Sequence, residues 1–311
     1  LCFILFCLFT LTIIYAGVRN GIERVSKFMM PILIVLSVLI AVYSVTRPGA
    51  MEGVKYFLVP NVKNFSWMTV VAAMGQMFYS LSIAMGILIT FGSYMKKETS
   101  LEDSTRNVEV FDTAIAIMAG LMIIPAVFAF SGGDPDTLQA GPALMFITIP
   151  KVFENMGFGT VVGILFFLLV LFAAVTSSIA LTESAVSTFE DELGWSRKRA
   201  TVLVGVIMIA LGSLSSLGYG PLVGIKIIGM QFLDFFDFLT NSVMMPIAAM
   251  LTSLFVSRIV GMKRMEDEIM HGESTFRRKK IFIVMIKYLC PVFALIILIS
   301  SVANAFGWIA M

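Results

Sequence analysis

A series of long, uninterrupted apolar segments limits the folds open to this chain more than any other feature. A helix that crosses the hydrocarbon core of a bilayer needs about 20 apolar residues. By this measure we expect eight spans, at roughly 1–17, 28–46, 67–94, 108–130, 157–182, 200–218, 228–256 and 281–304. The segments are continuously apolar rather than alternating, which favours helices over the strands of a membrane barrel. Because 59% of the residues are hydrophobic and only 14% are charged, there is too little polar surface for a water-soluble globule. The sequence therefore predicts an all-α polytopic membrane protein.

The lysines and arginines are distributed unevenly over the loops between these spans. One alternating set of loops carries 16 of the 22 basic residues, and the opposite set carries five. Cytoplasmic loops are enriched in lysine and arginine, so the first set is predicted to be cytoplasmic and both chain ends to face outward. The basic residues form no single patch and the net charge is only +2, which argues against a nucleic-acid partner. We expect a multi-pass protein of the plasma membrane, with the lipid bilayer as its surroundings.

The start of the chain and its reactive side chains set two further expectations. Leu1 opens an apolar run without the charged segment and small-residue cleavage site of a signal peptide, so we expect an N-terminally truncated chain. Cys2, Cys7 and Cys290 lie in apolar segments, and His271 lies in a charged loop. Their spacing predicts neither a disulfide framework nor histidine-based metal or triad chemistry within the membrane.

Polar residues interrupt the third predicted span between Gly75 and Gly86. Two serines, a glutamine and two glycines near the middle of a membrane weaken a continuous helix. A broken helix frees backbone groups that can bind ions or a charged substrate. Small residues can also serve only for close helix packing, but packing does not need the amide of Gln76. We therefore favour a binding site.

The fifth predicted span carries small and hydroxyl side chains on one face. Ala173, Thr176, Ser177, Ala180 and Leu181 recur at spacings of three and four residues. Neutral oxygens of this kind suit a hard cation such as Na⁺, although serine and threonine often bond back to their own helix.

Few ionisable residues fall inside the spans. Asp234 and Asp237 lie near enough to a span end to reach water, whereas Asp112 is read equally well as interfacial or as functional. The long outward loop at 131–156 has an apolar middle, and a lid over a vestibule and a passively packed loop are equally compatible with it.

With these features the chain resembles the neurotransmitter:sodium symporter family, and in particular a bacterial sodium-dependent amino-acid transporter. The resemblance spans residues 1–304 and rests on four motifs: GIERVSKFMMP at 21–31, GQMFYSLSIAMG at 75–86, TSSIAL followed by FEDEL at 176–193, and LDFFDF at 233–238. It implies a fold of two inverted five-helix repeats with the site between them.

The same resemblance implies how the chain is divided. Residues 1–311 would form a single transmembrane domain, in which 1–66 hold the last two helices of the first repeat. Residues 67–256 would be the second inverted repeat, and 257–311 a cytoplasmic loop and the final helix. The family's first three helices, which complete the site and are needed for activity, are expected to be missing.

Site residues carry over from the family by position. The resemblance implies that Tyr79 is an aromatic lid. It also implies a substrate pocket lined by Tyr79, Ser80, Ser82, Met85, Ser177 and Leu181. Ser80 and Asp112 match ligands of a first sodium site. The carbonyl of Ala173 with Thr176 and Ser177 matches a second, and both sites would be incomplete in this fragment.

The resemblance also implies gates and a chloride-site equivalent. Asp237 matches the acidic half of an outer gate, and Tyr94 with Asp191 matches an inner gate. Gln76 matches a chloride ligand, but Asp112 stands where many members have asparagine. Ala116 stands where chloride-dependent members have serine. We therefore expect that chloride is not required.

These observations predict sodium-coupled symport of a neutral, hydrophobic amino acid by alternating access, and no enzymatic activity. One alternative is a truncated fragment or scaffold that does not transport. A membrane-embedded enzyme is the other, and it is disfavoured because the spans contain no histidine, GxSxG or HExxH motif.

Overall fold

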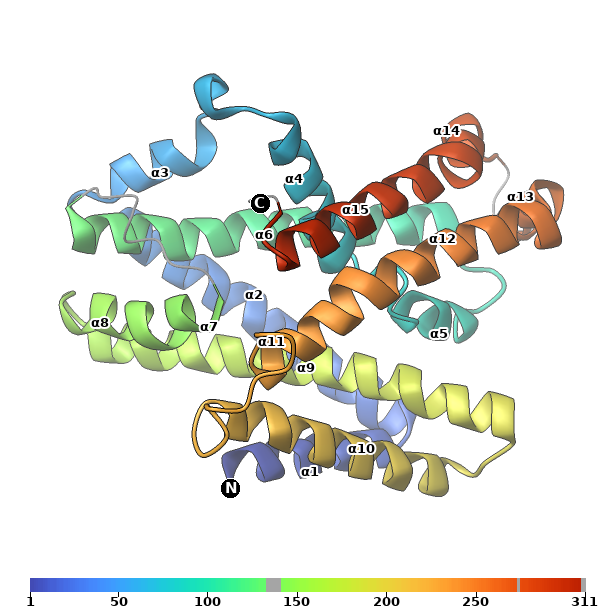
Figure 1. The fold of residues 1–311 in the computed structure, drawn as a ribbon, viewed down its shortest axis with the longest axis horizontal. Coiled ribbons are helices and arrows are strands. Elements are labelled where there is room, and N and C mark those ends of the chain that lie inside the picture. The colour runs from blue at the N-terminus through green and yellow to red at the C-terminus, as the bar shows by residue number, and fades with distance from the viewer. Residues whose placement is uncertain (133–140, 273–274, 309–311) are drawn as a thin grey trace. The chain divides into compact units, whose positions relative to one another are not determined.

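The computed structural model describes residues 1–132, 141–272 and 275–308, and helices dominate throughout these ranges (Figure 1). No β-strand occurs within them; a single isolated bridge joins Ile227 and Met230. The predicted all-α class is confirmed.

Six helical segments in the described part of the chain are long and apolar enough to cross a membrane: Val18–Val45, Leu101–Ser131, Gly159–Leu193, Arg197–Gly218, Phe232–Val260 and Lys279–Ala305. The sequence predicted eight such spans, and the other two differ for physical reasons. Helix α1 (Cys2–Tyr15) has only 14 residues, and Gly17 follows it with a left-handed φ of 90° that ends the regular helix. The segment at 67–94 is divided into two short helices, α4 (Trp67–Ser80) and α5 (Ile87–Ser93).

The break between α4 and α5 is built from left-handed backbone. Ser82, Ala84 and Gly86 have φ values of 54°, 63° and 81°. Residues with a Cβ adopt this region at a cost of about 1–3 kcal/mol, so surrounding contacts must hold it. Gly86 has the left-handed φ that favours glycine, and a Cβ there would lie 2.5 Å from the Ser184 hydroxyl oxygen. The broken helix predicted from the glycines and serines is confirmed.

The chain divides into two compact units. Unit 1 comprises residues 1–15, 66–109 and 180–311, and unit 2 comprises residues 16–65 and 110–179. Helices α6 (Leu101–Ser131) and α9 (Gly159–Leu193) each contribute one part to either unit.

Unit 2 has a core of large aliphatic and aromatic side chains. Its remaining elements are η1 (Val18–Ile22), α2 (Glu23–Val45), α3 (Ala50–Leu58), η2 (Val62–Asn64), α7 (Gly141–Ala143), η4 (Leu144–Thr148) and α8 (Ile149–Glu154). Ile40, Val127 and Phe166 are among the fully buried residues of this core. Ile149 and Val152 join it, so part of the apolar middle of the long outward loop is packed in the core. Residues 133–140 of that loop lie outside the described residues.

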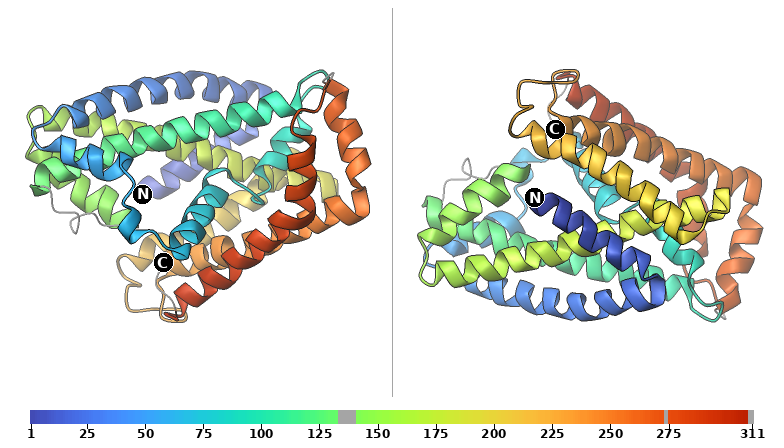
Figure 2. Two further views of the ribbon diagram at one scale, coloured as in Figure 1. Left: turned by 90° about the horizontal axis from the view of Figure 1, so that it is seen from above. Right: turned by 90° about the horizontal axis from the view of Figure 1, so that it is seen from below.

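In unit 1, helices pack in pairs, through glycine in one pair and through a serine hydroxyl beside another. The further elements are α10 (Arg197–Gly218), α11 (Phe232–Asp237), η5 (Phe238–Met244), α12 (Met245–Phe255), η6 (Val256–Val260), α13 (Met262–Ile269), η7 (Met270–Gly272), α14 (Lys279–Val284), η8 (Met285–Leu289) and α15 (Cys290–Ala305). Helix α1 lies along α10, where a Cβ on Gly205 would approach Leu11 to 2.8 Å. Helix α12 lies beside α15 (Figures 1 and 2), and the Ser253 hydroxyl donates to the Ile286 carbonyl at 2.6 Å. Helix α4 packs on α15, so the broken helix rests on the α12–α15 pair.

Candidate functional site

Three of the predicted substrate residues line one cavity in unit 1. Tyr79 lies near the end of α4, Met85 lies in the break, and Leu181 comes from α9. The cavity has a volume of about 490 Å³, and its other lining residues are Ala84, Thr240, Asn241, Met244, Met245 and Ala248. Most of this lining is hydrocarbon, with the two hydroxyls of Tyr79 and Thr240 and the amide of Asn241, which is the composition expected of a pocket for an apolar side chain.

A second cavity, of about 450 Å³, shares Tyr79, Asn241 and Met245 with the first. Gln76 and Asp237, predicted for the chloride-site equivalent and the outer gate, both line it. The Asn241 amide donates to the Asp237 carboxylate at 2.5 Å. The structure therefore brings the predicted outer-gate carboxylate and Tyr79 to the same cavity.

Sequence reasoning missed Thr240 and Asn241. Both lie in η5, a π-helical turn that directly follows Asp237. A π turn is wider than an α turn, and such turns are frequent at functional sites. Thr240 lies two residues after the end of the LDFFDF motif. The four-residue spacing between Asp237 and Asn241 is the sequence feature that could have indicated a contact between these two side chains.

The two predicted serines of the broken helix lie on either side of its end. Ser80 is the last residue of α4, and Ser82 is the first left-handed residue of the break. Both are partly buried. The serine hydroxyls therefore lie beside backbone N–H and C=O groups that would form intrahelical hydrogen bonds in a continuous helix.

The predicted cation ligands Ala173, Thr176 and Ser177 lie in the part of α9 that belongs to unit 2. The Thr176 hydroxyl oxygen lies 3.0 Å from the carbonyl oxygens of both Phe172 and Ala173. A hydroxyl has one proton, so donation to Phe172 leaves lone pairs on the Thr176 oxygen and on the Ala173 carbonyl. Bonding back to the helix and binding a cation are therefore compatible here.

Asp112 and Ala116 follow one another by one turn on the unit 2 part of α6. Asp112 is partly buried and Ala116 is exposed. The helix continues through both, so the carboxylate projects from regular helix rather than from a loop end.

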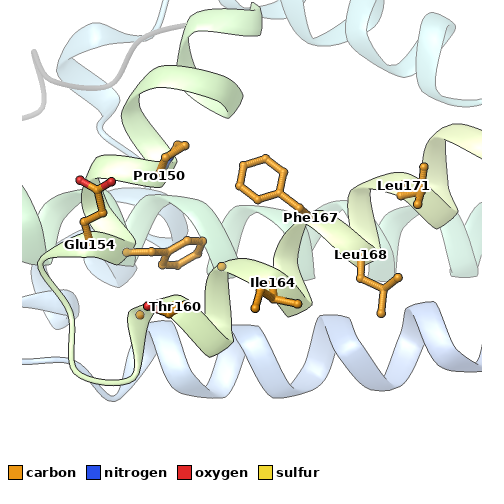
Figure 3. Close-up of a pocket in the computed structure, with 10 residues that line it drawn as sticks. Pro150, Glu154, Thr160, Ile164, Phe167, Leu168 and Leu171 are labelled. Atoms are coloured by element: carbon orange, nitrogen blue, oxygen red, sulfur yellow. The ribbon is translucent and has the colours of Figure 1, made fainter. Parts of the chain in front are cut away.

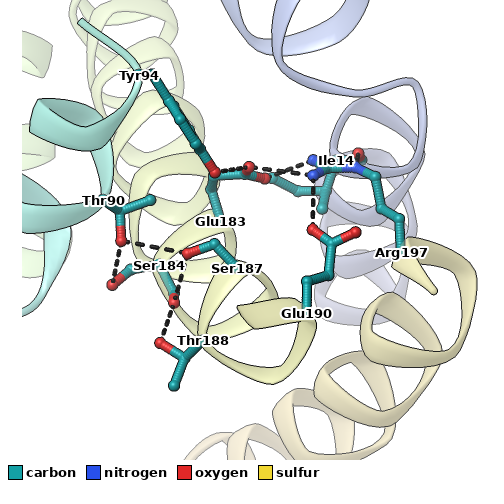
Figure 4. A network of polar contacts seen from close by, with 9 residues as sticks. All are labelled: Ile14, Thr90, Tyr94, Glu183, Ser184, Ser187, Thr188, Glu190 and Arg197. Carbon is teal, nitrogen blue, oxygen red and sulfur yellow. Dashed lines mark hydrogen bonds and ion pairs between the residues drawn. The ribbon is translucent and has the colours of Figure 1, made fainter. Parts of the chain in front are cut away.

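A buried ion-pair network dominates the polar contacts of unit 1 (Figure 4). Glu183 of α9 has no exposed side-chain surface, and the Arg197 guanidinium binds both of its oxygens, at 2.5 and 3.1 Å. The same guanidinium donates to Glu190 at 3.2 Å and to the Ile14 carbonyl at 2.8 Å. The Tyr94 hydroxyl donates to Glu183 at 2.8 Å. Such a buried charge is stable only because it is paired and hydrogen-bonded.

Of the two residues predicted for the inner gate, only Tyr94 belongs to this network. Tyr94, predicted as a gate residue, bonds to Glu183, whereas Asp191 is exposed at the C-terminal end of α9. No partner for the Asp191 carboxylate occurs among the residues that the structure describes. Sequence reasoning missed Arg197 because its partner lies 14 residues earlier, on the other side of a helix connection.

The hydroxyl of Thr90 extends the polar region beside this network. It lies 3.4 Å from the Ser184 hydroxyl and 3.3 Å from that of Ser187. These three residues and Gly86 join the broken helix to α9 at close range.

An apolar depression in unit 2 contains no predicted site residue (Figure 3). Its volume is about 650 Å³, and it is lined by Pro150, Phe153, Glu154, Gly159, Thr160, Gly163, Ile164, Phe167, Leu168 and Leu171. Apart from the Glu154 carboxylate and the Thr160 hydroxyl the side chains of this lining are hydrocarbon, which leaves few polar groups to orient a polar ligand.

Comparisons with known proteins identify relatives along almost the whole chain. The profile of the sodium:neurotransmitter symporter family matches residues 1–307. A Bacillus subtilis protein named as the uncharacterized sodium-dependent transporter YhdH is 35% identical over 271 residues, which are 87% of this chain and 59% of that protein. A Haemophilus influenzae protein named as an uncharacterized sodium-dependent transporter is 32% identical, over 96% of this chain and 64% of its own length.

The fold also matches a solved structure, that of MhsT in complex with L-phenylalanine. The TM-score is 0.83 at 37% sequence identity, over 96% of this chain and 66% of that one. The chain thus spans about two thirds or less of the length of these three proteins, and the two curated relatives are named as transporters and not as enzymes. The resemblance inferred from the motifs is confirmed: this chain is a multi-pass membrane protein that belongs to the sodium:neurotransmitter symporter family.

Proposed function

We propose that the full-length protein containing this chain carries out sodium-coupled symport of a neutral, hydrophobic amino acid by alternating access. The observation that supports this most directly is the cavity lined by Tyr79, Met85 and Leu181, whose walls are mostly hydrocarbon. The relatives' names as sodium-dependent transporters support the coupling ion. The L-phenylalanine bound to MhsT supports an apolar amino acid.

In this proposal the apolar wall of the cavity receives the substrate side chain. Ser80 and Ser82, with the backbone of the break, offer polar groups for the charged part of the substrate or for an ion. The Ala173 carbonyl with the Thr176 and Ser177 hydroxyls supplies neutral oxygen ligands for one of two sodium ions. Segments outside this chain would complete both sodium sites.

In this proposal different residues close the outer and the inner end of the site. Asp237 is the acidic residue of the outer gate, and its carboxylate accepts a hydrogen bond from the Asn241 amide. Tyr94 belongs to the inner gate, where it donates a hydrogen bond to Glu183 of the Glu183–Arg197 pair. Closing a site at one end while the other opens requires contacts that exist in only one of the two states, and paired charges at helix ends supply them.

The transport proposal is tested with purified full-length protein in liposomes. We expect uptake of radiolabelled L-phenylalanine to require an inward sodium gradient and to stop when potassium replaces sodium. Binding of the amino acid without sodium-driven uptake would instead support a scaffold that does not transport.

Thr176→Val and Ser177→Ala should each lower the apparent sodium affinity of uptake. Each change removes one oxygen ligand with little change in side-chain volume, and we expect the sodium concentration at half-maximal uptake to rise at least about fivefold. The matched control is Thr160→Val, the same change near the start of the same helix. An unaltered sodium titration in both variants would contradict the assignment.

Asp237→Asn should slow uptake more than it weakens substrate binding. The change keeps the size of the side chain and a hydrogen-bonding partner for Asn241, but it removes the charge needed to hold a cation across the outer opening. Binding is measured by scintillation proximity and uptake in liposomes, with Asp234→Asn, also exposed, as the control. Equal losses in the two assays would speak against a gating role.

A further inference from the structure

Four consecutive cations, Arg277 to Lys280, stand at the start of α14, in a loop that the distribution of basic residues predicts to be cytoplasmic, and the structure divides them into two kinds. The Arg278 guanidinium donates to both oxygens of Glu109, at 3.0 and 2.8 Å, and this ion pair raises the pKa of Arg278. The Lys279 ammonium pairs with Glu266 of the neighbouring helix α13. The two inner cations are therefore already neutralised by carboxylates.

The two outer cations, Arg277 and Lys280, are exposed. Neither side chain makes an ion pair or hydrogen bond with any residue in 1–132, 141–272 or 275–308. The backbone N–H of Arg277 donates to Glu102 at 3.1 Å, which holds this turn against the start of α6. Arg277 lies in the turn just before α14 and Lys280 lies in its first turn, so both charges stand at the same end of this helix.

An exposed apolar stripe continues from Lys280 along the same helical segment. Ile281, Val284 and Tyr288 follow at spacings of three and four residues, and they are 66%, 47% and 64% exposed. The segment Lys279–Ala305 is one of the six candidate spans, so an exposed apolar stripe on it faces lipid chains. Two cations without a carboxylate partner among the described residues thus border hydrocarbon at the level of the lipid headgroups.

We propose that Arg277 and Lys280 form a binding site for an anionic phospholipid of the cytoplasmic leaflet. The two cations hold the headgroup phosphate, and one acyl chain lies along Ile281 and Val284. A zwitterionic lipid fits less well because its own ammonium group opposes the two basic side chains. Free phosphate lacks the chain that the apolar stripe accommodates. Glu109 and Glu266 contribute by neutralising the inner cations and fixing the start of α14.

The experiment measures lipid retention and not transport, so its outcome is independent of the proposed function. Purified full-length protein is titrated with dioleoyl phosphatidylglycerol or with dioleoyl phosphatidylcholine, and bound lipids are counted by native mass spectrometry. The test variant is Arg277→Gln/Lys280→Gln. Its control is Lys263→Gln/Arg264→Gln, which removes the same charge from exposed positions on α13.

We expect the wild type and the control to retain phosphatidylglycerol in preference to phosphatidylcholine. The test variant should lose this preference by about tenfold, since each basic residue at an anionic surface contributes several-fold. Three results would overturn the proposal: an unchanged preference in the test variant, an equal loss in the control, or no preference in the wild type. Matching melting temperatures of wild type and variants in lipid-free detergent show that the variants are folded.

Discussion

Arg197→Met should destabilise the protein by about 3 kcal/mol, because it leaves the Glu183 carboxylate buried without a counter-charge. Glu183 has no exposed side-chain surface, and water cannot replace the two contacts that the guanidinium makes. The measurement is chemical unfolding in mixed micelles. Glu190→Gln is the control, since Glu190 binds the same guanidinium but is 25% exposed. We expect its effect to stay below about 1 kcal/mol.

The double variant Glu183→Gln/Arg197→Met separates the charge from the packing. A glutamine carbonyl still accepts the hydrogen bond from Tyr94, and no charge stays buried. We therefore expect most of the lost stability to return. If the double variant is as unstable as Arg197→Met alone, the Ile14 contact or the packing of the arginine stem matters more than the charge.

Asp112→Asn should reduce uptake by the full-length protein at least about tenfold. A sodium ion near the membrane midplane needs nearby negative charge, because an uncompensated cation in a low dielectric is costly. Asp112 is partly buried on α6, and in our proposal its carboxylate supplies this charge. For the same reason uptake by the wild type should be equal in chloride and in gluconate at fixed sodium.

The variant Asp112→Asn/Ala116→Ser extends this prediction. The serine adds a hydroxyl donor one turn from the new amide, so we expect uptake to return in chloride but not in gluconate. Ala116→Ser alone is the control and should stay independent of chloride. A wild type that stops working in gluconate would show that Asp112 does not supply the balancing charge.

The helical class and the break in the third span could be predicted because both depend on local sequence. Apolar runs of about 20 residues have few alternatives to a membrane helix. Glycine and serine between Gly75 and Gly86 weaken the helix where α4 ends. The number of continuous spans was harder to predict, since α1 has only 14 residues and the segment at 67–94 was counted as one span although it is divided into α4 and α5.

The site could be predicted only as far as positional resemblance and short spacings allowed. Tyr79, Met85 and Leu181 were all predicted, and they line one cavity. The Glu183–Arg197 pair was missed because partner choice between charges depends on how helices pack, and several acidic residues competed for the same arginine. Asn241 was missed because a π turn changes which residues share a face.

The position of Tyr79 has a consequence for how substrate size could be sensed. Its side chain lines two cavities of similar volume, as Asn241 and Met245 also do; Met85 and Leu181 line one of these cavities, and Gln76 and Asp237 line the other. A bulky substrate side chain that displaces Tyr79 in the apolar cavity therefore also changes the lining of the cavity that contains Asp237.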